Sequence, residues 1–293
     1  MTNPETYWLK YASQNAKMER LAYYILIKAF QSYMQKVADR INKVGAQQTL
    51  VEMDFIFNEE GVRQAYQDIY YQVGLKHKRW TDEDVRRRFK RKKEEDDRQR
   101  RPNPLSRILP KPKPVTPPVF EETNFSVGFF NQQWLNRLKN IVNSVDITQR
   151  IASVTETVKK RVVKSIQESL QIYVSPLKII AKLRRDAGSS FIRERAEMIV
   201  RTEVTHITNI SAEQSAVETG LDLVKVWIAT KDDKTRDTHR AVGNRRPIKA
   251  NEKFNVGGYM MERPGDSSAP ISQVANCRCV VAFLPADDYE DLF

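Results

Sequence analysis

The start of the chain repeats its apolar residues at roughly helical spacing from Leu9 to Ile41. This spacing places them on one side of an α-helix, and Gly45 is a suitable stop. We therefore predict one long helix over residues 4–44, and the fold must cover a helix of that length. The aromatic residues on this helix fit the buried face of a helical bundle or, alternatively, a surface that docks on another protein.

Two further helices are expected in the N-terminal half. Asn58 can act as an N-cap and is followed by acids, so one helix should run from Asn58 to Val73. A second start lies at Thr81, but few apolar residues follow it up to Arg101. A helix with so little to bury is either exposed to solvent or ordered by a partner.

The formal net charge of the chain is +12, and most of the surplus is local. Residues 76–113 hold 16 lysines and arginines against seven acids. An acidic polymer is the expected partner, with nucleic acid favoured over a membrane, and a solvated charged helix is the alternative. Contacts with the phosphate backbone would be sensitive to salt and indifferent to base sequence. The residues predicted to bind double-stranded DNA are Arg86, Arg87, Arg88, Lys90, Arg91, Lys92 and Lys93.

A proline-rich segment separates the two halves of the chain. Residues 102–118 hold seven of the 13 prolines, a composition typical of polyproline II geometry and of a semi-rigid spacer. The sequence therefore predicts a helical N-terminal region over residues 1–101 that ends in the basic helix. A linker over residues 102–119 and a second domain over residues 120–293 follow.

The cellular compartment is predicted from features that the sequence lacks. No run of residues approaches the roughly 18 apolar positions of a membrane span, and we find no secretory signal at the N-terminus. The two cysteines are separated by one residue and do not form a disulfide framework. A soluble protein of a reducing compartment is expected.

The second half of the chain begins with helices and ends with strands. Helical spacing and capping residues predict helices over residues 134–145, 147–173, 176–188 and 191–219. Alternation of β-branched and aromatic residues predicts strands over residues 223–228 and 280–284. Long helices followed by a small late sheet, with an irregular glycine- and proline-rich segment between its strands, indicate an α+β fold.

Two polar residues, Glu203 and His206, interrupt the apolar face of the last long helix. A buried polar group is costly unless it is hydrogen-bonded, so both should have partners. The favoured interpretation is a structural network that holds the loops of the sheet to this helix. A catalytic Glu/His pair and metal ligation by His206 are alternatives. The residues assigned to the network are Arg201, Glu203, Asp233, Arg236, Asp266 and Asn276.

Cys277 and Cys279 have one residue between them and can chelate a single metal ion, with zinc as a candidate. Residues two apart on a strand point to the same face, so both thiols can meet a shared partner. His239 is the first candidate for a third ligand, and His206 or Asp266 could complete a tetrahedral set. The alternative is a metal-free pair with one buried and one exposed cysteine.

Sequence motifs for catalysis are absent from the chain. We find no dinucleotide-binding glycine loop, no phosphate-binding loop, no HExxH zinc motif and no GxSxG serine nucleophile motif. We therefore expect no enzymatic activity. A nucleophile pair made of Cys277 or Cys279 with His239 remains the alternative.

Several weak motifs occur in a characteristic order in the second half of the chain. They are Arg201-Thr202-Glu203 on a helix, Trp227 on a strand, Asp233 with Thr235-Arg236 and His239, Pro264-Gly265-Asp266, and Asn276-Cys277-Arg278-Cys279. In this order and spacing, residues 130–285 resemble the phage Mu F-like head-morphogenesis family of minor capsid proteins. The N-terminal 120 residues are not part of the resemblance.

The resemblance implies a low-copy protein inside the head of a tailed bacteriophage, associated with the portal protein and with packaged double-stranded DNA. Major capsid or scaffold proteins are further expected partners, and no membrane is involved during assembly. The protein would occupy the host cytoplasm during assembly and the capsid interior in the virion.

Members of the family are treated as assembly or delivery factors without established catalysis. Some relatives carry a toxin at the C-terminus, and we expect none here because the sequence continues for only 14 residues after Cys279. The alternative function is that of a metal-dependent nuclease or a Cys/His hydrolase that acts during infection.

Overall fold

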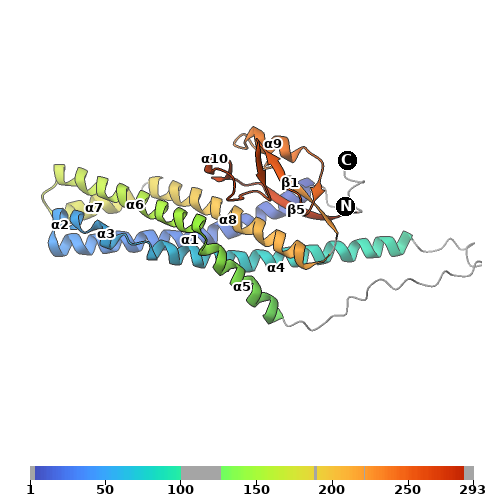
Figure 1. The fold of residues 1–293 in the computed structure, drawn as a ribbon. Helices are drawn as coiled ribbons and strands as arrows, with labels where there is room; N and C mark the ends of the chain where they lie inside the picture. The colour runs from blue at the N-terminus through green and yellow to red at the C-terminus, as the bar shows by residue number, and fades with distance from the viewer. Residues whose placement is uncertain (1–3, 100–126, 188–189, 221, 287–293) are drawn as a thin grey trace, which may run out of the picture.

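The computed structural model describes residues 4–99, 127–187, 190–220 and 222–286 (Figure 1). The predicted linker at 102–119 lies outside these ranges. The elements are α1 (Pro4–Val44), α2 (Ala46–Val51), α3 (Met53–Ile56), α4 (Glu60–Gln99), α5 (Val127–Val142), α6 (Val145–Ile172), α7 (Pro176–Ala187), α8 (Ser190–Glu218), β1 (Leu223–Ile228), α9 (Asp237–Gly243), β2 (Ile248–Lys249), β3 (Phe254–Val256), β4 (Tyr259–Met261), α10 (Ile271–Val274) and β5 (Val280–Pro285).

The long helices form an elongated bundle in which α1, α4 and α8 pack on one another (Figure 1). Their buried faces merge into one hydrophobic core, which includes Ile69 of α4, Leu138 of α5 and Ile207 of α8. Helices from the predicted regions 1–101 and 120–293 therefore fold against each other. The boundary proposed from composition therefore separates two parts of the sequence. Residues on both sides of it contribute to the same hydrophobic core.

The helix that starts at Glu60 continues to Gln99, where the sequence predicted two separate helices. Thr81 does not cap a new helix, because its hydroxyl donates a hydrogen bond to the carbonyl oxygen of His77 one turn earlier. Lys78 in the same turn is buried and pairs with Asp82 and with Glu218 of α8. Contacts between this turn and the bundle therefore keep α4 helical at Thr81, where the local sequence predicts the start of a new helix.

The sheet confirms the α+β prediction. Its three strands lie in the order β2-β1-β5, and both pairs are antiparallel. Trp227 of β1 lies opposite Val281 of β5, so the two strands predicted from alternation are direct neighbours. β3 and β4 form a separate two-stranded hairpin.

The first turns of α1 lie under this sheet. Tyr7 and Tyr11 form a small core with Val226, Val280 and neighbouring residues of β1 and β5. Further along α1 the aromatic residues are buried in the bundle, apart from some exposed side chains such as Tyr24. The bundle-face interpretation of the aromatic residues is therefore right, and the docking-surface interpretation is wrong for most of them, because the protein itself covers the stripe.

His77 is a buried titratable group between α1 and the sheet side of the bundle. Its ring packs edge-on against Tyr11 and beside Trp80, and neither ring nitrogen has a hydrogen-bond partner within the described ranges. Burial lowers the pKa of His77 to about 3. The folded protein therefore keeps this imidazole neutral at pH values where the unfolded chain, with a pKa near 6.5, binds a proton.

Folding stability should accordingly fall as the pH drops from about 6.5 towards 3, because only the unfolded chain takes up the proton at His77. Replacement of His77 by phenylalanine removes this component. Between pH 7 and pH 4.5 we expect wild type to lose about 2 to 3 kcal/mol more stability than His77→Phe. Urea denaturation at both pH values measures the difference, and parallel losses in the two proteins would contradict the expectation.

Candidate metal centre

The turn that precedes the cysteines is fastened to α8. Asn276 has a φ of 57°, the left-handed conformation that asparagine tolerates better than most residues. Its backbone N–H donates to the hydroxyl of Thr202 at 2.8 Å, and its side-chain oxygen accepts a hydrogen bond from Arg201 at 2.7 Å. Arg236 closes the turn from the other side by donating to the carbonyl oxygen of Ala275. The chain therefore enters the cysteine segment in one fixed direction.

The backbone of the cysteine segment is held by the next two turns of α8. The hydroxyl of Thr205 donates to the carbonyl oxygen of Cys277 at 2.6 Å. Asn209 donates to the carbonyl oxygen of Cys279 and accepts from the N–H of Val281, at 3.2 and 2.7 Å. Because residues three and four positions apart share a helix face, this polar row can bind an extended segment along its length. The sequence analysis missed both residues.

Three side chains converge above this segment. Nδ1 of His239, on α9, lies 3.6 Å from Sγ of Cys277 and 3.4 Å from Sγ of Cys279. The three potential ligand atoms all lie within 4.8 Å of one another. All three residues are at most 3% exposed, and Trp227 packs against the imidazole edge at a centroid distance of 5.2 Å. The structure thus brings together three of the four residues named as metal ligands.

Each of the two thiols shifts the pKa of the other. A hydrogen bond with Cys277 lowers the pKa of Cys279 well below that of a free cysteine, and His239 adds to this effect against the opposing influence of burial. The same hydrogen bond, together with burial, raises the pKa of Cys277. Of the two thiols, Cys279 is therefore the more easily deprotonated. A thiolate is the form of cysteine that binds a metal or attacks an electrophile.

The burial of the sulfur atoms bears on the two chemical alternatives. Cys277 and Cys279 are 3% and 2% exposed. A substrate could reach a cysteine nucleophile only if the sheet loops opened, whereas a small ion fits between the three side chains. The arrangement therefore favours a metal centre over a Cys/His hydrolase.

Residues 139–282 match the model of the family described as Phage Mu protein F like protein. This stretch is phage Mu F-like. The matched stretch begins in α5 and includes α8, β1, His239 and both cysteines. It agrees with the resemblance seen in the order of the motifs. The Mu F-like family is a phage head-morphogenesis family, so the match supports a protein associated with the phage head.

A curated relative is the NAD(+)--arginine ADP-ribosyltransferase EFV of Enterococcus faecalis (strain ATCC 700802 / V583). It is 24% identical over 158 residues, which cover 53% of this chain and 32% of that protein. The chain therefore spans about a third of the length of the curated relative that it matches. No solved structure matches the chain.

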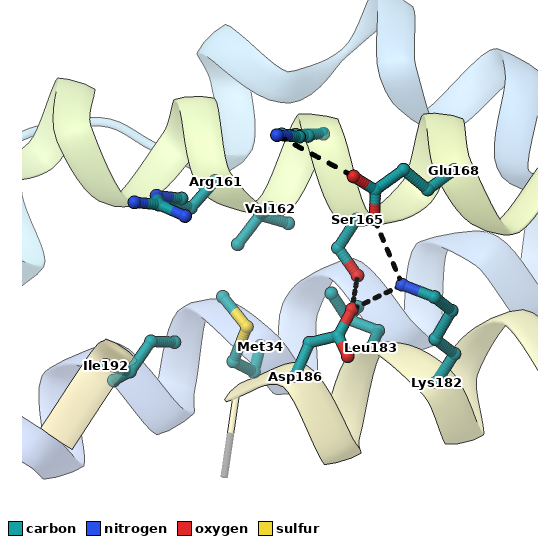
Figure 2. Close-up of a pocket in the computed structure, with 10 residues that line it drawn as sticks. Met34, Arg161, Val162, Ser165, Glu168, Lys182, Leu183, Asp186 and Ile192 are labelled. Carbon is teal, nitrogen blue, oxygen red and sulfur yellow. Dashed lines mark hydrogen bonds and ion pairs between the residues drawn. The ribbon is translucent and has the colours of Figure 1, made fainter. Parts of the chain in front are cut away.

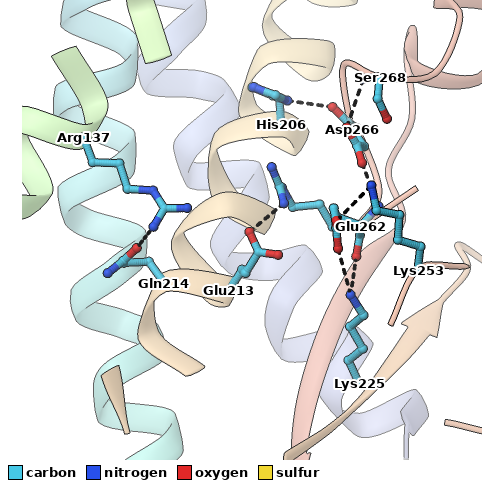
Figure 3. Close-up of polar contacts among 11 residues, drawn as sticks. Arg137, His206, Glu213, Gln214, Lys225, Lys253, Glu262, Asp266 and Ser268 are labelled. Carbon is cyan, nitrogen blue, oxygen red and sulfur yellow. Dashed lines mark hydrogen bonds and ion pairs between the residues drawn. The ribbon is translucent and has the colours of Figure 1, made fainter. Parts of the chain in front are cut away.

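His206, the fourth residue named as a metal ligand, serves the Mu F-like region differently. Its Nδ1 lies 2.6 Å from the carbonyl oxygen of Gly265, and burial lowers its pKa to about 3. Gly265 has a φ of 79°, and a Cβ added there would lie 3.1 Å from the backbone of His206. Asp266 accepts backbone N–H bonds from Glu262 and Ser268 (Figure 3). His206 therefore fastens the Pro-Gly-Asp turn to α8, while Asp266 closes the turn within its own loop.

Glu203 belongs to the bundle and not to the network that holds the sheet loops. Its carboxylate accepts a hydrogen bond from Tyr70 of α4 at 2.6 Å and pairs with Arg150 of α6 at 3.3 Å. Its assignment to the loop network was wrong in this respect. Glu203 lies two positions before Thr205, a rotation of about 200° around the helix, so the two side chains point to opposite sides of α8.

Asp233 was assigned to the network, but its neighbour Asp232 makes the contacts. Asp232 accepts hydrogen bonds from the N–H of Lys234 and the hydroxyl of Thr235, and it pairs with Arg278. Asp233 is exposed. An aspartate three positions before a buried threonine is a local turn signal that would have indicated Asp232.

The basic end of α4 lies far from the metal centre. This part of the helix projects beyond the bundle (Figure 1), and Arg86 and Arg87 are exposed there. The side chains of the other predicted DNA-binding residues, from Arg88 to Lys93, lie outside those that the structure describes. None of the helices in the described ranges is long and apolar enough to span a membrane.

A groove between α6 and α7 is a competing candidate site (Figure 2). Its charged residues pair with one another: Lys182 contacts both Glu168 and Asp186, and Ser165 donates to Asp186 at 2.6 Å. Lys164 also pairs with Glu168. With its charges matched in this way, the groove favours neither an anionic nor a cationic ligand.

Removal of the Asn209 side chain tests the attachment of the cysteine segment. Asn209→Ala leaves the N–H of Val281 and the carbonyl of Cys279 without these partners in a buried position, which should cost about 2 to 4 kcal/mol. Denaturant unfolding measures the loss. Glu197→Ala, at an exposed position of the same helix, is the matched control. Equal stability of the two variants would show that Asn209 does not hold the segment.

Proposed function

We propose that this Mu F-like protein is a minor capsid protein that lies inside the head of a tailed bacteriophage and connects the portal to packaged DNA. The head assignment rests on the family. The DNA contact rests on one observation from the structure, the basic end of α4 that projects from the bundle (Figure 1). During assembly the protein would occupy the host cytoplasm, and in the virion it would occupy the capsid interior.

The shape of the α4 end supports contact with nucleic acid. Tertiary packing would have to stabilise a 40-residue helix along its length, yet its last turns carry few apolar residues and extend past the bundle. Exposed Arg86 and Arg87 begin the run of basic residues there. A projecting rod of positive charge can lie along phosphates without a shaped cleft, so the binding should be sensitive to salt and indifferent to base sequence.

The end of the bundle opposite the basic end of α4 exposes apolar side chains. The turn between α6 and α7 exposes three apolar side chains, Ile172, Val174 and Leu177, and Val174 is fully exposed. Apolar side chains gathered in one turn are poor partners for DNA and good partners for protein. We assign this turn to contact with the portal protein, with the shell or scaffold proteins as the other outcomes of a crosslinking test.

Charge reversal at the end of α4 should weaken DNA binding. For Arg86→Glu with Arg87→Glu we expect lower affinity for duplex DNA and a salt dependence whose slope falls by about two to four, because two phosphate contacts become repulsive. Fluorescence anisotropy over a salt series measures both quantities. The matched control reverses Arg184 and Arg185, an exposed arginine pair at the end of α7. Unchanged affinity and slope in the α4 variant would remove the DNA assignment.

The location in the head is tested by quantitative mass spectrometry of purified particles before and after triggered ejection of DNA. We expect the protein in filled heads in a few to a few tens of copies. Loss on emptying would identify it as cargo that leaves with the DNA, and retention would make it a fixture of the portal or shell. Its absence from both kinds of particle would refute the capsid assignment.

The same particles test the portal-facing turn. Val174→Ser with Leu177→Ser should lower the number of copies per head, because the apolar contact is lost while the fold keeps its core. Val217→Ser changes an apolar residue of α8 that is also exposed and should leave the copy number unaltered. Equal incorporation of both variants would show that the turn is not the docking surface.

A further inference from the structure

We infer that Cys277, Cys279 and His239 bind one zinc ion, which joins α9 to the segment leading into β5. This inference goes beyond the proposed function and does not depend on it. Neither the proposed location in the head nor the proposed DNA contact requires an ion at the cysteine group.

The donor atoms select the metal. Two sulfurs and one imidazole nitrogen are the ligands of zinc sites, whereas magnesium and calcium prefer oxygen. In a tetrahedral site with Zn–S distances of about 2.3 Å and a Zn–N distance of about 2.0 to 2.1 Å, sulfur and nitrogen lie about 3.6 Å apart. The two distances from Nδ1 of His239 to the sulfurs are 3.6 and 3.4 Å. The two sulfur–nitrogen distances are therefore close to those that a bound ion requires.

The nearly equal distances are hard to explain by hydrogen bonding alone. Nδ1 has either one lone pair or one proton, so it can form a well-directed hydrogen bond with one sulfur at a time. An imidazole aimed between two sulfurs instead points its nitrogen towards a shared centre. Three donor groups that converge on one point have the geometry needed to coordinate a single metal ion.

The surroundings prepare the sulfurs for a cation. The backbone N–H of Cys279 donates to Sγ of Cys277 at 3.4 Å, and such bonds stabilise a thiolate. Thr205 and Asn209 fix the carbonyl groups of the two cysteines, so the sulfurs keep their separation without the ion. The site is thus preorganised on one side by α8 and completed by a single residue of α9.

Three protein ligands leave a fourth position on a tetrahedral ion, and we assign it to a water molecule. Thr230, which hydrogen-bonds Cys279 through its backbone, also has a buried hydroxyl without a partner among the described groups. This hydroxyl is a polar neighbour for such a water. Burial of all three ligands fits a role in stability, because a substrate has no direct route to the ion.

The ion would add its binding free energy to the folded state. α9 has seven residues and is too short to be stable alone, so a bond from His239 to the cysteine segment would hold it on the sheet. Removal of the metal should therefore loosen the region around α9 and Trp227 and leave the helical bundle folded.

Metal analysis of the full chain, purified without chelators, is the first test. We expect about one zinc per chain, and loss of zinc in Cys277→Ser, Cys279→Ser and His239→Ala. Val242→Ala, a buried residue of α9 that is not a ligand, is the matched control and should keep its zinc. A stable wild-type protein that takes up no zinc from an equimolar solution would overturn the inference, as would full zinc content in the ligand variants.

Spectroscopy of the wild-type chain keeps the inference testable if the variants fail to fold. Replacement of zinc by cobalt should give a near-ultraviolet thiolate-to-metal absorption band, and X-ray absorption at the zinc edge should show two sulfur neighbours. A chelator should lower the melting temperature by roughly 5 °C or more. A zinc edge with only nitrogen and oxygen neighbours would place the ion elsewhere and overturn the assignment.

Discussion

Helix α8 is the element on which both parts of the molecule depend. Ile207 on one face completes the core of the bundle, while Thr205 and Asn209 on another face bind the backbone of the last strand and its approach. The hydroxyl and amide side chains replace the backbone partners that an isolated strand segment would lack. A buried backbone group without a partner is costly, so this polar row fixes the position of the sheet more specifically than apolar packing would.

The sequence predicted the elements whose pattern is local. Alternation placed β1 over residues 223–228 with the observed bounds, and helical spacing located α1. The end of the Asn58 helix could not be predicted, because the burial of Lys78 and Thr81 depends on α8 and on the packing of α1. Local capping residues describe what a segment can do alone, and tertiary contacts overrode them at Thr81.

The site could be predicted in part. The spacing of Cys277 and Cys279 indicated a shared partner, and the fold brought His239 to them. His206 was an equally reasonable ligand on paper, but its face of α8 meets Gly265. Which of two histidines reaches a cysteine pair depends on the rotation of a helix and the path of a loop, and neither is encoded in residue spacing. Asn209 was overlooked because an asparagine inside a helix has no conspicuous pattern.

The shared core of the bundle has a consequence for synthesis on the ribosome. α1 and α4 emerge well before α8, yet the apolar faces of all three close on one another. α8 ends more than a hundred residues after α4. Part of the apolar surface of α1 and α4 therefore stays uncovered until α8 has been synthesised. Contacts so distant in sequence slow folding and expose the nascent chain to aggregation.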